Sequence, residues 1–187
     1  MRFNVPLVLA VAGLAQATPV TNNDLVKRDA AAVVDAVTTI SDATVELNTT
    51  VSSYGGGLLG TGTALKIQIQ AIGLSNDIKD AISTTQESKN FTTDGSMAVS
   101  EAFLDLQPTI ASSLDTFVRK KPEIDTGLLG IGSLAFLVKA NLENLRDLAG
   151  QLGEEVTAKL APPYNELAPT ILQQITDKFD KTIAVYS

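Results

Sequence analysis

Hydrophobic residues recur at helical spacing along most of this chain, and no stretch shows the two-residue alternation of a half-buried strand. Glycines at 55–57 and the pair Pro162-Pro163 separate the periodic segments, as residues that end helices do. The third segment contains Pro108, which predicts either a kink or a split there. The segments cover roughly residues 30–53, 58–85, 94–121, 126–160 and 164–185. The pattern predicts an all-α fold: a closed bundle of about five amphipathic helices.

A glycine-containing motif occurs twice in the chain. Leu58–Thr63 reads LLGTGT, and Leu128–Ser133, seventy positions later, reads LLGIGS. The apolar pattern of Asp35–Val51 also corresponds to that of Glu101–Phe117. We therefore predict a duplicated helical hairpin followed by a fifth helix. Chance similarity between two glycine-rich helix starts is the alternative interpretation.

The first residues have the pattern of a secretion signal. Arg2 supplies a basic start, and Val5–Ala15 is an apolar run too short to span a bilayer. Ala15 and Ala17 then form the small-x-small pattern of a signal-peptidase site. We predict a signal peptide over residues 1–17, ending at Ala17, and hence a secreted protein.

A dibasic pair follows the predicted signal peptide. Residues 18–28 end in Lys27 and Arg28, which predicts a short leader removed by proteolysis; a pair of ordinary surface charges is the alternative. Residues 29–187 then form one helical-bundle domain. Loss of three of the 14 basic and one of the 21 acidic residues leaves 11 against 20, so nucleic acid and anionic membranes are poor partners.

The chain contains no cysteine and no histidine. Disulfides, thiolate metal sites and Ser-His-Asp or Cys-His catalysis are therefore excluded. Acidic pairs such as Glu154 and Glu155, or Asp177 and Asp180, lie beside lysines, as on solvated helix surfaces. We expect no enzyme activity, no metal and no cofactor.

Two sequons are potential N-glycosylation sites if the chain is secreted. Asn90 lies in a polar stretch that we predict to be a loop. Asn48 lies near the end of the first predicted helix, where occupancy is less favoured.

The apolar stripes allow three interpretations. They can form an ordinary packed core, they can surround a cavity that takes an alkyl chain, or the bundle can open and present them to a hydrophobic surface. A cavity with aliphatic walls suits a lipid, because each buried methylene contributes ~0.8 kcal/mol. Our candidate wall residues are Ile69, Ile72, Phe103, Ile110, Leu134, Leu137, Ile171 and Ile175.

The chain resembles the fungal hydrophobic surface-binding protein A family, which includes antigenic cell-wall galactomannoproteins. The resemblance spans Asp29–Ser187 and rests on the dibasic pair before Asp29–Val34 (DAAAVV), the Gly57–Gly60 turn, and the absence of cysteine and histidine. It implies a secreted, wall-associated helical bundle. Some members of the family resemble fatty-acid binders and others adsorb to hydrophobic polymers. The resemblance supplies no ligand residues.

The C-terminal end differs from that of wall-anchored members. Tyr186 and Ser187 follow the fifth segment directly, without a Ser/Thr-rich stalk or an apolar tail, so we expect no glycolipid-anchor signal. Our leading hypothesis is a secreted protein that binds a long-chain fatty acid or similar lipid and is released or held non-covalently in the wall. The alternatives are an adsorption protein that coats hydrophobic surfaces, or a structural mannoprotein without a ligand.

Overall fold

A computed structural model describes residues 22–127 and 133–187, with side chains from residue 28 onward. The predicted signal peptide, including Ala17, lies outside these residues. All regular elements of the described residues are helical, which confirms the all-α fold. The elements are α1 (Asn22–Ser53), the 3-10 turn η1 (Leu58–Gly60), α2 (Thr61–Glu87), α3 (Thr93–Arg119), α4 (Lys121–Asp125), α5 (Ala135–Lys159) and α6 (Tyr164–Val185).

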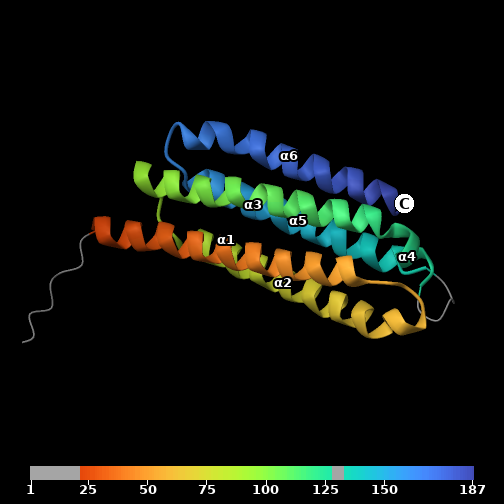
Figure 1. The fold of residues 1–187 in the computed structure, drawn as a ribbon. Coiled ribbons are helices and arrows are strands. Elements are labelled where there is room, and N and C mark those ends of the chain that lie inside the picture. Colours follow the sequence, from red (N-terminus) through yellow and green to blue (C-terminus); the bar gives the residue numbers. More distant parts are fainter. Residues whose placement is uncertain (1–21, 128–132) are drawn as a thin grey trace, which may run out of the picture.

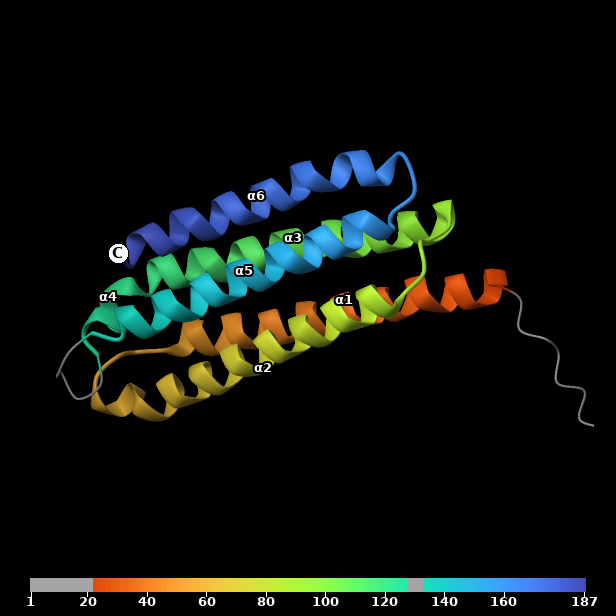
Figure 2. The same ribbon diagram turned by 180° about the vertical axis from the view of Figure 1, so that it is seen from behind.

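The five long helices pack as a closed ring. The α1 helix packs against α2 and α3, α2 also packs against α5, and α6 joins α5 to α3. In Figures 1 and 2 the α1–α2 hairpin lies on one side of the molecule, α6 lies on the other, and α3 and α5 lie between them. Consequently α3 and α5 lie on opposite sides of the interior and do not pack against each other as neighbouring helices of the ring do.

The two predicted hairpins pack differently in this ring. The α1 helix packs directly on α2, whereas α6 lies between α3 and α5. The first copy of the repeated motif forms η1 and leads into α2. Most of the second copy, residues 128–132, lies outside the described residues. The duplication therefore stays a prediction.

Several helix boundaries differ from those expected. The α1 helix begins at Asn22 rather than near residue 30, so the predicted processing pair Lys27 and Arg28 lies within the helix, with Arg28 exposed. The α3 helix begins at Thr93 and is capped by Thr92, whose hydroxyl oxygen accepts the Gly95 N–H at 3.1 Å.

The fourth predicted segment begins later than expected. A short α4 starts with Pro122 in its first turn, where a missing N–H removes no helical hydrogen bond. Gly127 then takes a φ of 64°, which ends this turn, and α5 begins only at Ala135. The α3 helix, in contrast, continues through Pro108, which therefore does not split the segment.

The core is built from the predicted stripes. On α1, Val33, Val37, Leu47 and Val51 are buried. Each fully buried aliphatic side chain contributes roughly 1.5–3 kcal/mol. Thr44 lies on the same stripe, between Ile40 and Leu47. Its buried hydroxyl is satisfied, because it donates to the Ile40 carbonyl at 2.7 Å. No helix of the described residues is long and apolar enough to cross a membrane.

Candidate functional site: an apolar cavity inside the ring

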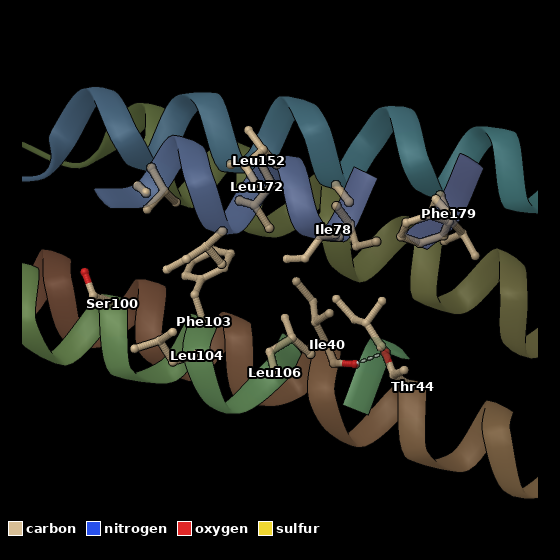
Figure 3. A pocket seen from close by; sticks show the side chains of 18 of the residues that line it. Ile40, Thr44, Ile78, Ser100, Phe103, Leu104, Leu106, Leu152, Leu172 and Phe179 are labelled. Carbon is tan, nitrogen blue, oxygen red and sulfur yellow. Dashed lines mark hydrogen bonds between the residues drawn. The ribbon is translucent and has the colours of Figure 1, made fainter. Parts of the chain in front are cut away.

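A cavity of about 400 Å³ lies at the centre of the ring. All five long helices contribute to its wall, and most of the wall side chains are aliphatic or aromatic. Figure 3 shows these side chains converging from helices on opposite sides of the interior. The apolar residues that define it are Ile40 and Leu47 of α1, Leu74 and Ile78 of α2, Phe103, Leu106 and Ile110 of α3, Leu142, Leu145, Ala149, Leu152 and Val156 of α5, and Ile171, Leu172, Ile175 and Phe179 of α6.

The cavity follows from the number of helices in the ring. With axes about 9 Å apart, a regular ring of five places each axis about 7.7 Å from the centre, against about 6.4 Å in a ring of four. In the wider ring of five, side chains of the size of Leu, Ile and Val do not fill the centre as fully as they do in a ring of four. Aliphatic side chains on five helices therefore leave space that the same side chains in a four-helix bundle would fill.

The cavity opens between the N-terminal halves of α3 and α6. Deep wall residues such as Leu47 and Leu142 are fully buried, whereas Met97 and Leu104 on α3 are 44% and 48% exposed. Leu167 on α6 is 60% exposed. A wall residue that is both apolar and exposed marks the place where the interior reaches solvent.

Phe103 lies just inside the opening. Figure 3 shows its ring pointing from α3 towards Leu172 of α6 and Leu152 of α5, while Leu104 lies on the other flank of α3. Leu172 in turn packs against α5 where Gly153 has no side chain; a Cβ there would lie 2.6 Å from a Leu172 methyl carbon. The glycine therefore lets α6 approach α5 closely at this end of the cavity.

Few polar groups reach the cavity. The hydroxyls of Thr44 and Thr157 donate to the carbonyls one turn earlier, Ile40 at 2.7 Å and Gly153 at 2.6 Å. Ser100, Ser113 and Tyr164 add further hydroxyls. Among the described residues, Glu101, which is exposed, is the one carboxylate of the wall, and no lysine or arginine belongs to it. Such a surface can hold an alkyl chain by burial, but it offers no group arranged for proton transfer.

The groups with shifted pKa values lie elsewhere. Burial raises the pKa of Tyr186, with Asp125 and Glu123 adding to the effect, and burial next to Asp80 raises that of Asp77. The Lys121 ammonium lowers the pKa of Asp125 through a hydrogen bond. None of these residues belongs to the cavity wall. Within the described residues, no group of three or more acidic side chains is arranged to hold a metal.

Four of the predicted wall residues lie in the cavity wall: Phe103, Ile110, Ile171 and Ile175. They share the stripes of α3 and α6 that face the middle of the ring. The wall residues of α1, α2 and α5 are not among the eight predicted ones. Their helical spacing was the available signal, but it cannot separate a filled interior from a hollow one.

The other four predicted wall residues do not line the cavity. Ile69 and Ile72 are 61% and 52% exposed, because α2 turns its Ala71–Leu74–Ile78 stripe towards α1 and α5 and leaves its second stripe facing solvent. Leu134 and Leu137 are half-buried at the start of α5, more than one turn before its first wall residue, Leu142. They lie at the end of the bundle, before the part of α5 that lines the cavity.

The two sequons lie in different surroundings. Asn90 is exposed in the connection between α2 and α3. Asn48 is half-buried near the end of α1, as predicted, and its amide nitrogen lies 3.4 Å from the Ser112 hydroxyl of α3. The acidic pairs lie on the surface, where Asp180 pairs with Arg146 at 2.9 Å and Glu155 accepts from Gln86 at 2.8 Å.

Comparison with known proteins adds a family. The family model described as hydrophobic surface binding protein A matches residues 30–158, which is more than half of the chain. Cell wall mannoprotein 1 of Aspergillus flavus is 25% identical over 187 residues. That alignment covers all of this chain and 63% of the relative, so the chain spans less than two thirds of the relative's length.

Two solved structures share this fold. AFMP4P, solved in complex with palmitic acid, superposes with a TM-score of 0.77 and 27% identity over 84% of this chain and 99% of that one. Ligand binding domain 1 of Penicillium marneffei MP1 protein, complexed with arachidonic acids, gives a TM-score of 0.73 at 18% identity, over 82% and 95% of the two chains; at that identity the likeness concerns the fold alone. Since the family model matches more than half of its residues, the chain belongs to the hydrophobic surface binding protein A family.

Proposed function

We propose that this protein binds a long-chain fatty acid or a similar lipid inside the ring, with the acyl chain in the apolar cavity. The observation that carries the proposal is the cavity of about 400 Å³, walled by all five long helices and open between α3 and α6. Its volume lies within the range of ligand pockets, about 300–1,000 Å³. The complex of AFMP4P with palmitic acid, in a chain 27% identical, supports it.

The burial energy is sufficient for micromolar binding. Fourteen methylenes of a sixteen-carbon chain contribute roughly 11 kcal/mol at ~0.8 kcal/mol each. Subtracting the lower end of the association cost, about 4 kcal/mol, leaves about 7 kcal/mol. That corresponds to a Kd of about 10 μM.

Native mass spectrometry of delipidated protein tests the proposal. We expect one palmitate to bind at tens of micromolar lipid, to be lost on denaturation, and to raise the melting temperature. Protein that stays free of ligand across this range, with an unchanged melting temperature, would contradict lipid binding and leave the cavity without a role.

The proposed setting is the cell surface or cell wall. A relative named as a cell wall mannoprotein and a family described by surface binding support an extracellular location. Residues 1–17 then act as the signal peptide, and Lys27–Arg28 as a processing site. We further propose that the protein acts by binding, without catalysis. N-terminal sequencing of the secreted protein tests both cuts: a first residue of Thr18 or of Asp29 distinguishes one cut from two.

Adsorption to a hydrophobic surface is a second candidate function, and the exposed stripe of α2 favours it. Leu65, Ile69 and Ile72, one turn apart, are each more than half exposed, and Leu59 at the preceding turn is 98% exposed. An intact bundle therefore presents apolar side chains without opening. Replacing Leu65, Ile69 and Ile72 with serine should prevent depletion by hydrophobic beads while palmitate binding is retained. Equal depletion of variant and wild type would contradict this role.

A further inference from the structure

The parts of α3 and α6 that border the cavity opening contain acidic residues and no basic ones. Residues 93–118 of α3 contain Asp94, Glu101, Asp105 and Asp115 but no lysine or arginine. Residues 160–177, which lead into α6 and form most of it, contain Glu166 and Asp177 and again no base. The rim of the cavity, formed by these parts of α3 and α6, is therefore negatively charged. A negatively charged lipid head group at the opening is repelled by it.

Two lysines that follow these parts of the chain, Lys178 of α6 and Lys159 of α5, are engaged elsewhere. Lys178, the first basic residue of α6, forms an ion pair with Asp115 of α3, so the charge of Asp115 is neutralised. Lys159, at the end of α5, donates to the carbonyl oxygens of Ser88 at 2.6 Å and Gln86 at 3.3 Å, on the α2 side of the molecule. Of the five remaining acids, Glu101 belongs to the cavity wall, and Asp105 and Glu166 follow and precede the wall residues Leu104 and Leu167. All three are exposed, and they set the charge of the rim.

The interior offers a carboxylate no positively charged partner. Among the described residues, no lysine or arginine belongs to the cavity wall, and its polar groups apart from Glu101 are hydroxyls or the backbone. The hydroxyls of Thr44 and Thr157 already donate to backbone carbonyls. A carboxylate drawn inside would lose its hydration without gaining a cation, which is costly in an apolar site. An uncharged head group avoids both penalties.

We infer that this cavity prefers long-chain lipids with an uncharged hydroxyl or ester head group, such as a monoacylglycerol, over a free fatty-acid carboxylate with the same chain. The inference rests on the proposed function, because an acyl chain must occupy the cavity for its head to reach the rim. Like charges at a hydrated surface, within a Debye length of about 8 Å, weaken binding about threefold to tenfold. The effect is a preference, and fatty acids remain ligands.

A competition experiment tests the preference. Delipidated protein is offered palmitate and 1-palmitoylglycerol together, and native mass spectrometry gives the ratio of the two bound masses. The variant Glu101→Gln/Asp105→Asn/Glu166→Gln removes the rim charge, and Glu87→Gln, at the exposed end of α2, is the matched control. Comparing ratios between proteins cancels any difference in how the two lipids are delivered.

We expect the ratio of bound palmitoylglycerol to bound palmitate to fall about threefold to tenfold in the rim variant and to stay unchanged in Glu87→Gln. Equal ratios in wild type and rim variant, with both lipids bound, would overturn the inference while the proposed function stands. Binding of neither lipid to the wild type would overturn the proposed function and the inference with it.

Discussion

Ala149 lines the cavity from α5, in the part of the wall that faces α3 and α6. Replacing it with phenylalanine places a ring in the space that the acyl chain would occupy. The neighbouring wall residues Leu145 and Leu152 are already buried, so the added phenyl group is expected to occupy the empty interior. The perturbation removes ligand space without removing a core contact.

The expected loss of affinity follows from the displaced methylenes. A phenyl ring takes the place of about five methylenes, which at ~0.8 kcal/mol each amounts to about 4 kcal/mol. The Kd for palmitate should therefore rise about a thousandfold, from about 10 μM to about 10 mM. The free protein should keep or gain stability, because filling roughly 80–100 Å³ at ~24 cal/mol per Å³ contributes up to about 2 kcal/mol.

Thermal unfolding of delipidated protein, with and without palmitate, measures both effects. Ligand at a hundred times Kd adds about 2.7 kcal/mol of stability. For a domain of this size each kcal/mol moves the melting temperature by about 2–4 °C, so the wild type should gain about 5–11 °C. Ala149→Phe should show no gain at the same palmitate concentration.

The control is Ala140→Phe, the same substitution on the exposed face of α5. It should bind palmitate as the wild type does. If Ala149→Phe folds and still gains 5–11 °C with palmitate, the chain lies elsewhere and the assignment of the cavity as the binding site is wrong. Far-ultraviolet circular dichroism of both variants establishes that each is folded before ligand is added.

In a eukaryotic secretion host, Asn90→Gln should remove a glycan mass and Asn48→Gln should not, because Asn90 is exposed in a loop and Asn48 packs against α3; intact-mass measurement decides, and a glycan on Asn48 would contradict the packing argument. Leu142→Ala should lower the free energy of unfolding by about 2–5 kcal/mol in urea titrations, since Leu142 is only 1% exposed; a loss below 1 kcal/mol would mean that the interior relaxes around it. Tyr186→Phe removes the hydroxyl that donates to the Phe117 carbonyl at 2.5 Å and should cost about 1 kcal/mol near pH 7. Burial raises the pKa of Tyr186 above its ordinary 10.0, so the stability that the neutral phenol contributes is complete below pH 10 and is lost as pH rises above it. The wild type should therefore lose stability above pH 10 more steeply than Tyr186→Phe. Parallel curves of unfolding free energy against pH would refute this.

The candidate site was partly predictable, for a local reason. Residues such as Phe103 and Ile175 lie on apolar stripes that helical periodicity exposes directly, and both face the interior. Ile69 lies on an equally clear stripe and faces solvent. Nothing local distinguishes these positions, because the choice depends on which sides of α2 are covered by α1 and α5.

The helices, the absence of thiol and imidazole chemistry and the acidic character of the chain were predictable, because each depends on residue type or on spacing along one helix. Tertiary packing sets the rest: α6 lies between α3 and α5, the ring of five keeps a cavity of about 400 Å³, and its opening lies beside Glu101, Asp105 and Glu166. These features depend on the order in which helices close the ring. That order is set by the summed packing of faces from distant parts of the chain, which no single segment encodes.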